Sequence, residues 1–169
     1  MEMLRNVLFD VIDKVYTPGD KYTPIRFSDK TEADDYVGRN YKDLSKSLCG
    51  IDLGRIMSIC SHSLNTISDK NAIEEIEKAF SVIKGLPDNV VLFRSGEMRI
   101  ENRPYLSASF CADISRNYLS FPSVYPHVII AKKNSRIIPL RAITEHAGET
   151  EVIIDSRRLE REGNYYIYK

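Results

Sequence analysis

The sequence predicts an α+β fold, because segments with helical periodicity fill the first half of the chain and short strand-like segments fill the second. Residues 1–86 are expected to be mainly helical, and residues 90–169 to consist mainly of strands that carry the functional side chains. The chain has 169 residues, of which 43% are hydrophobic, and this suffices for one compact domain with a substantial core. We therefore expect a single domain over residues 1–169.

The first two helices are predicted from apolar residues at helical spacing. One apolar stripe runs through residues 4–15. A second runs from Val37 to Leu48, with Thr31 as the expected N-cap and Gly50 as the expected stop.

Two more helices are expected before residue 86. The third begins at Asp52 and carries an inward apolar face as far as residue 64. In the fourth, Asn71 with Glu74 resembles a capping pair, and Glu74 is spaced to form an ion pair with Lys78 on the exposed side.

The second half begins with a continuous apolar run over residues 90–93, typical of a strand buried on both faces, and this run ends at Arg94. The last strand-like segment, Tyr165 to Tyr168, is aromatic enough for base stacking. Alternation favours instead a half-buried strand whose tyrosine hydroxyls reach water. Strands are expected at residues 90–93, 105–110, 127–131, 136–140, 152–155 and 165–168.

Charge and composition restrict the classes of partner. Lys plus Arg and Asp plus Glu both number 24, so bulk charge favours neither a nucleic-acid nor a membrane partner, although Lys132, Lys133 and Arg136 form a local basic patch. No apolar stretch reaches the length of a membrane span and no cleavable signal is recognisable, so we expect a cytoplasmic protein. The three cysteines lack metal-ligand spacing, and no metal is expected.

Near the C-terminus, Glu149 and Glu151 stand two residues apart, immediately before a β-branched run. On a strand both side chains project to one side, where two carboxylates repel each other. A cationic partner would relieve this repulsion, and the transition state of glycosidic bond cleavage carries such positive charge. A solvated edge strand would explain the pair equally well if it stood alone.

The pair does not stand alone. An arginine that ends a buried strand (residues 91–94), a Ser-x-Ser on a strand (residues 105–110) and the Glu-x-Glu that opens a strand (residues 148–154) follow in this order. In these motifs the chain resembles the Arg-Ser-Glu branch of the ADP-ribosyltransferase family, over roughly its C-terminal half. The resemblance implies a helical N-terminal part packed on a mixed β core of two small sheets that surround an NAD cleft.

The resemblance also implies roles for the first two motifs. Arg94 would grip the pyrophosphate or the adjacent ribose of NAD, for which a planar guanidinium is suited. Ser107 would hydrogen-bond the catalytic glutamate, and Ser109 shares its face of the strand. Family members often have glycine directly after the arginine, whereas here Ser95 comes first and Gly96 second.

In the third motif, Glu151 matches the catalytic glutamate, which would hydrogen-bond the nicotinamide ribose and stabilise developing positive charge. Glu149 matches the position that is glutamate in arginine-modifying members, and its anion would bind and help deprotonate a guanidinium acceptor. His146 stands where many relatives carry an aromatic residue that helps to capture the target.

The function implied is mono-ADP-ribosyl transfer from NAD to arginine on a target protein. Small stand-alone enzymes of bacteriophages and bacterial effectors of host cells have this character, by family analogy alone. One alternative keeps the NAD chemistry with nucleic acid, a small molecule or water as the acceptor. Another is a non-catalytic binding module on the same fold.

Overall fold

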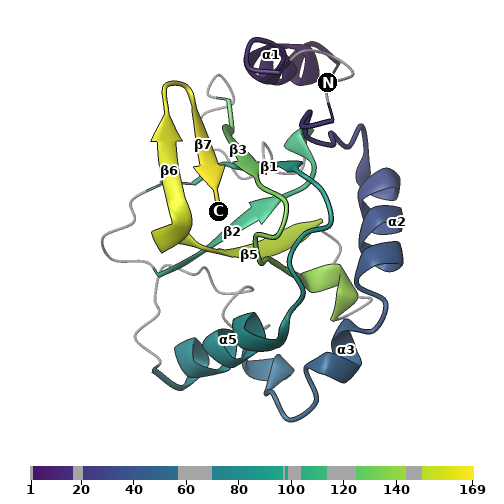
Figure 1. Cartoon of the computed structure of the whole chain (residues 1–169), viewed down its shortest axis with the longest axis vertical. Coiled ribbons are helices and arrows are strands. Elements are labelled where there is room, and N and C mark those ends of the chain that lie inside the picture. The colour runs from purple at the N-terminus through teal and green to yellow at the C-terminus, as the bar shows by residue number, and fades with distance from the viewer. Residues whose placement is uncertain are drawn as a thin grey trace.

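The computed structural model describes residues 2–16, 21–56, 70–96, 98, 104–113, 125–143 and 150–169. Its helices are α1 (Glu2–Asp13), α2 (Lys30–Asn40), α3 (Leu44–Ser47) and α5 (Lys70–Val82), with 3-10 turns η2 (Leu140–Ala142) and η3 (Ser156–Arg158). Its strands are β1 (Val90–Arg94), β2 (Tyr105–Ser109), β3 (His127–Ala131), β4 (Ile138–Pro139), β5 (Glu151–Asp155), β6 (Leu159–Glu162) and β7 (Tyr165–Tyr168). Helices thus precede strands, and the predicted α+β class is confirmed. Figure 1 shows α1 above the sheet, α2 and α3 along one side of it, and α5 below.

The strands form one mixed seven-stranded sheet in the order β4-β5-β2-β1-β3-β7-β6. Only β3 and β7 pair in parallel, and the other neighbours are antiparallel. Two separate sheets were expected, whereas the described strands form one continuous sheet. β1 and β2 meet at a single register pair, Phe93↔Ser109, so the β4-β5-β2 half and the β1-β3-β7-β6 half are joined over a very short length.

β1 is buried along its whole length because both of its faces are covered. Val90 and Leu92 belong to the main core, the cluster that packs β1, β2, β3 and β5 against α2 and α5. Val91 and Phe93 point to the other face and pack against Leu8 and Ile12 of α1. The unbroken apolar run in the sequence therefore reflects a strand with apolar partners on both sides.

The N-cap of α2 is Asp29, not Thr31 as predicted. The Asp29 side chain accepts a hydrogen bond from the backbone N–H of Glu32 (3.0 Å), and Glu32 Oε2 accepts one from the backbone N–H of Ser28 (2.8 Å). This reciprocal pair satisfies two N–H groups at the helix start, whereas Thr31 already lies inside the helix. The Asp29 carboxylate, at the end of the preceding loop, is better placed than Thr31 to accept a hydrogen bond from the first turn of α2.

The apolar stripe predicted from Val37 to Leu48 is buried, but it belongs to two helices. α2 ends at Asn40, and the short helix α3 presents Leu44 to the main core. Gly50 follows with φ +86°, a left-handed conformation that L side chains avoid, in agreement with its predicted role as a stop.

The third predicted helix is described only in its first turn. Residues 53–56 are helical, and the Asp52 side chain accepts a hydrogen bond from the backbone N–H of Arg55 (2.9 Å). The rest of that predicted segment lies outside the described residues.

α5 differs from the prediction at its start and on its exposed face. The helix includes Lys70, so Asn71 lies in its first turn rather than at its N-cap. Lys78 Nζ donates to Glu75 Oε1 at 2.6 Å, a pair with i,i+3 spacing, so Glu75 replaces Glu74 as the hydrogen-bonding partner. Glu74 contributes only its electrostatic field at Lys78.

The C-terminal hairpin holds the main departures among the strands. β6 has a single buried apolar residue, Leu159, and was not predicted for that reason. It pairs with β7 through a tight turn in which Gly163 has φ +59°. Tyr168 is fully buried, and its hydroxyl donates to the Arg136 carbonyl (2.5 Å) and accepts from the Asp155 N–H (3.2 Å). The prediction that all tyrosine hydroxyls of this strand reach water was therefore wrong.

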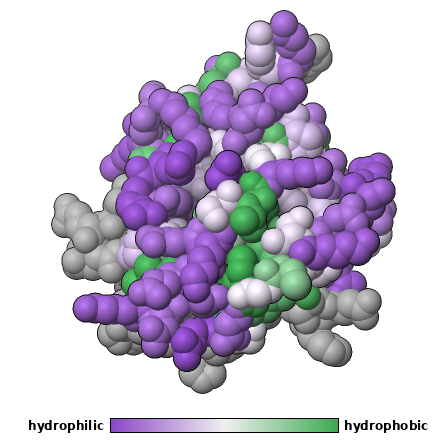
Figure 2. All heavy atoms as spheres, turned by 60° about the horizontal axis from the view of Figure 1, so that its bottom comes forward, coloured by the Kyte–Doolittle hydropathy of each residue, from purple (hydrophilic) through white to green (hydrophobic). Residues whose placement is uncertain are grey.

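The surface is mostly hydrophilic. Figure 2 shows an apolar strip, bordered by hydrophilic residues, on the face that comes forward when the bottom of Figure 1 is turned toward the viewer. Within the ranges given above, no helix combines the length and apolar character that crossing a bilayer would require.

Replacement of Asp29 by alanine should lower the free energy of unfolding by about 1 kcal/mol, because the helix loses a capping acceptor. The matched change Thr31→Ala, two residues along the same helix, should alter it by less than about 0.5 kcal/mol. Urea unfolding of both variants measures the difference. An equal or larger loss for Thr31→Ala would place the cap where the sequence first suggested.

Candidate functional site

Arg94 ends β1 at the place where β1 and β2 diverge. Its guanidinium reaches across to β2, and Nη1 donates to the Ser107 carbonyl oxygen at 2.6 Å and lies 3.3 Å from Ser107 Oγ. Only 8% of Arg94 is exposed. Burial of a charged group is costly unless it is paired, so these bonds to Ser107 contribute to holding the guanidinium in place.

Gly96 leaves room for this guanidinium. A Cβ atom at position 96 would lie 2.7 Å from Arg94 Nη2, closer than real Cβ atoms approach, and 3.1 Å from Cζ, which is a tight contact. In this chain the close approach is made at Gly96.

β2 and β5 bring the serines and the glutamate to one face. In their antiparallel register Ser109 is opposite Glu151, and Ser107 is opposite Ile153. Since directly opposite residues share a face, Ser107, Ser109 and Glu151 project to the same side. Ser107 and Glu151 are diagonal neighbours, a relation that places Cα atoms about 7–8 Å apart.

The Ser109 hydroxyl is engaged within the protein. Its oxygen lies 2.8 Å from Thr150 Oγ1 and accepts the backbone N–H of Cys111 at 3.1 Å. Thr150 also hydrogen-bonds the Cys111 thiol, which counteracts in part the rise in the pKa of that thiol caused by burial. Ser109 therefore fixes the residue that directly precedes Glu151. The sequence analysis missed Thr150, although a hydroxyl beside the expected glutamate was the available signal.

His127 was predicted only to open a strand, but it lies directly beside Arg94 in the β1–β3 register. Its ring makes an edge-to-face contact with Tyr166, with the centroids 5.8 Å apart. Its imidazole is exposed at the end of the sheet, yet partial burial lowers its pKa, and the guanidinium groups of Arg94 and Arg161 lower it further. This end of the sheet therefore favours a neutral imidazole and carries a local excess of positive charge.

The structure thus brings four of the predicted site residues together on three consecutive strands: Arg94, Ser107, Ser109 and Glu151. Glu149 and His146, predicted to contact the acceptor, lie outside the described residues.

The basic patch proposed from the sequence is largely used inside the protein. Lys132 Nζ donates to Tyr16 Oη (2.8 Å). Arg136 Nη1 donates to the carbonyl of Phe80 (2.8 Å), near the C-terminal end of α5, where a cation is favoured. Of the three residues, Lys133 has no side-chain bond within the described part of the chain, which is weak support for a nucleic-acid interface.

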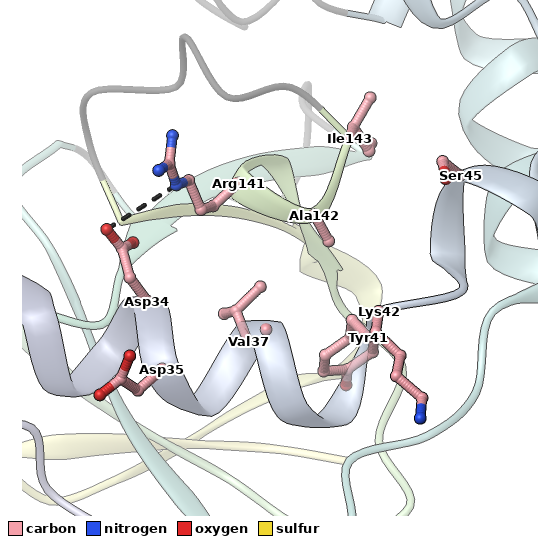
Figure 3. Close-up of a pocket in the computed structure, with 10 residues that line it drawn as sticks. Asp34, Asp35, Val37, Tyr41, Lys42, Ser45, Arg141, Ala142 and Ile143 are labelled. Atoms are coloured by element: carbon pink, nitrogen blue, oxygen red, sulfur yellow. Dashed lines mark ion pairs between the residues drawn. The ribbon is translucent and has the colours of Figure 1, made fainter.

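A hollow of about 540 Å³ opens between α2 and η2. Figure 3 shows that Asp34 and Asp35 come from α2, that Arg141, Ala142 and Ile143 come from η2 and the residue after it, and that an ion pair links Asp34 to Arg141 across the hollow. The Asp34 Oδ2 to Arg141 Nε distance is 3.8 Å. The described residues include no group of three or more His, Cys, Asp and Glu side chains placed to hold a metal ion.

No family model and no curated protein matches the chain. Solved structures do resemble it. One is an ADP-ribosyltransferase of Clostridium botulinum, at 17% identity and a TM-score of 0.52 over 86% of this chain and 96% of that one. Another is an ADP-ribosylating toxin of C. perfringens, part of a binary enterotoxin and solved with NADH, at 15% identity and a TM-score of 0.53 over 79% of this chain and 42% of that one. At these identities the likeness establishes the fold alone, and the chain has the ADP-ribosyltransferase fold.

The lowered pKa of His127 predicts a pH dependence of stability. Because the folded pKa lies below the ordinary value of 6.5, the unfolded chain binds the proton more readily, and the contribution of His127 to stability falls as pH decreases below 6.5. His127→Gln removes this term, so its unfolding free energy should fall less steeply than that of the wild type. Urea unfolding from about pH 5 to about pH 8 tests this, since the two curves should run parallel above pH 7 and diverge below it. Parallel curves throughout would contradict it.

Proposed function

We propose that this protein is a mono-ADP-ribosyltransferase, which uses NAD as co-substrate and transfers ADP-ribose to an arginine of a target protein. One observation carries this most directly. On the ADP-ribosyltransferase fold, the Arg94 guanidinium is hydrogen-bonded to Ser107 while Glu151 stands on the adjacent strand, on the same face as Ser107.

The donors and acceptors of these residues fit NAD. A guanidinium is suited to the oxygens of a pyrophosphate, and a carboxylate and a hydroxyl are suited to the hydroxyls of a ribose. Arg94 would bind the phosphates, with Arg161 adding to the positive potential at that end of the sheet. Ser107 would orient both Arg94 and the nicotinamide ribose.

In the reaction, the bond between C1′ of the ribose and the nicotinamide nitrogen breaks, and its electron pair leaves with nicotinamide. Glu151 would accept a hydrogen bond from a ribose hydroxyl and stabilise the positive charge that develops at the ribose. The acceptor nitrogen then forms the new bond to C1′ and gives up a proton. Ser109, through Thr150, would hold Glu151 in position.

Arginine as the acceptor follows from Glu149, whose carboxylate would bind a guanidinium and take up its proton. His146 would contact the target. The resemblance to stand-alone enzymes of bacteriophages or bacterial effectors suggests a protein of the host cell as the target. Nucleic acid, a small molecule or water is the alternative acceptor, and the engagement of Lys132 and Arg136 inside the protein weighs against nucleic acid.

Glu151→Gln keeps the shape of the side chain and removes its charge. We expect nicotinamide release from NAD to fall by about 100-fold or more, because the developing positive charge loses its counter-charge. Glu162→Gln, the same change at an exposed position of β6, is the matched control and should release nicotinamide at the wild-type rate. Near-normal turnover of Glu151→Gln would rule out its catalytic role. A wild-type protein that binds NAD but releases no nicotinamide would instead indicate a non-catalytic module.

Glu149→Ala should separate the two halves of the reaction. Transfer of labelled ADP-ribose to lysate proteins should be lost, while nicotinamide release in the absence of acceptor should persist, since only acceptor binding and deprotonation are affected. Mass spectrometry of the modified proteins identifies the side chain that carries ADP-ribose in the wild-type reaction. Equal loss of both activities, or modification of a side chain other than arginine, would contradict the assignment.

A further inference from the structure

The hollow between α2 and η2 contains a glycine in a helix, and this glycine has no evident role inside the protein. Gly38 lies in the last part of α2 and is exposed. A Cβ atom added there would meet nothing within 4 Å, so close packing does not require glycine. Glycine inside a helix is destabilising relative to alanine. Its effect is to leave bare backbone in the wall of the hollow.

Two charged residues flank this bare backbone. Asp35 and Gly38 lie on α2, Lys42 lies two residues past its C-terminal end, and all three line the hollow. Neither Asp35 nor Lys42 forms an ion pair within the described part of the chain, whereas Asp34 pairs with Lys30 and Arg141. Asp35 and Lys42 therefore offer unmatched charges of opposite sign to the hollow.

Between these charges Val37 on α2 and Ala142 and Ile143 across the hollow supply apolar surface, and Ser45 and the Asp34–Arg141 ion pair also line it. The hollow thus fits a short extended peptide with a basic residue toward Asp35, an acidic residue toward Lys42 and an apolar side chain in the middle.

The hollow also adjoins the candidate site. Its η2 wall directly follows β4, which pairs with β5 so that Pro139 is opposite Val152, the residue after Glu151. On its α2 wall, Asp34 is near enough to Cys111 to affect the pKa of that thiol, and the Cys111 N–H bonds Ser109. A protein segment seated here would hold its neighbouring residues close to Glu151.

We propose that this hollow docks an extended segment of the acceptor protein, of the charge pattern basic–apolar–acidic, against the bare backbone at Gly38. This rests on the proposed transferase function. The site that recognises the acceptor protein is then separate from the residues that bind NAD.

Gly38→Gln tests it, because glutamine favours a helix and fills the hollow. Arg39→Gln is the matched control, with the same side chain one residue along on an exposed position that does not line the hollow. For each protein three rates are measured: nicotinamide release from NAD without acceptor, transfer to agmatine as a small guanidine acceptor, and transfer to lysate proteins. Thermal unfolding of each variant checks its fold.

We expect Gly38→Gln to retain the first two rates within about twofold and to lose transfer to protein by about tenfold or more, a loss of about 1.4 kcal/mol in acceptor binding. Arg39→Gln should retain all three. Asp35→Asn and Lys42→Gln should each weaken transfer to protein to a smaller degree.

Other outcomes overturn the docking role. Transfer to protein at the wild-type rate in Gly38→Gln would show that the hollow is not used. Loss of all three rates in a folded Gly38→Gln protein would assign the hollow to NAD or another small molecule. A wild-type protein that releases no nicotinamide and modifies no acceptor would refute the proposed function itself, and the docking site with it.

Discussion

The contact between the Arg94 guanidinium and Ser107 is the interaction on which the site geometry depends. Within the described residues, β1 and β2 share only the register pair Phe93↔Ser109, although each strand has five residues. Arg94 supplies the next link between the two halves of the sheet, through a charge-assisted hydrogen bond to a backbone carbonyl. A buried guanidinium requires such partners, because a charge taken out of water is costly unless it is hydrogen-bonded. Arg94 therefore both links the two halves of the sheet and contributes positive potential at the candidate site.

The remaining site residues are fixed by the sheet rather than by loops. Glu151 takes its direction from the β2–β5 register, and Thr150 before it is held by Ser109. Placement on strands limits positional error more than placement on a loop does, as a catalytic group requires. Gly96 leaves space for the Arg94 guanidinium, since a Cβ there would approach Nη2 to 2.7 Å and the local arrangement would have to shift.

Prediction from the sequence was most accurate for segments whose structure is determined by their own local residue pattern. The run of residues 90–93 predicted a doubly covered strand, and the alternation of Ser107 and Ser109 correctly placed both on one face. It was least informative where the determining partner is distant. β6 is held by its pairing with β7 rather than by apolar residues of its own. The Arg136 guanidinium donates hydrogen bonds to backbone carbonyl groups of α5. Such long-range bonds leave no local pattern in the sequence.

The predictions of the N-cap of α2 and of two separate sheets were wrong for related reasons. Thr31 and Asp29 are both good capping residues, and only the path of the preceding loop decides between them. Likewise, a single register pair between β1 and β2 is too brief to appear in any sequence periodicity. At the candidate site, the roles of Thr150 and Gly96 could be recognised only from the residues that lie beside them in the structure.

The register between β2 and β5 has a kinetic consequence. Tyr105 pairs with Asp155 across fifty positions of chain, and β3 pairs in parallel with β7 across nearly forty, from Val128 to Tyr165. Forming each pairing costs the conformational entropy of closing a long loop, and the hydrogen bonds of the pairing offset this cost only after the loop has closed. Chains dominated by such remote pairings fold in about milliseconds to seconds rather than microseconds. Glu151 is placed opposite Ser109 only when the long loop between β2 and β5 has closed, so a chain without that pairing would not hold the carboxylate beside Ser107.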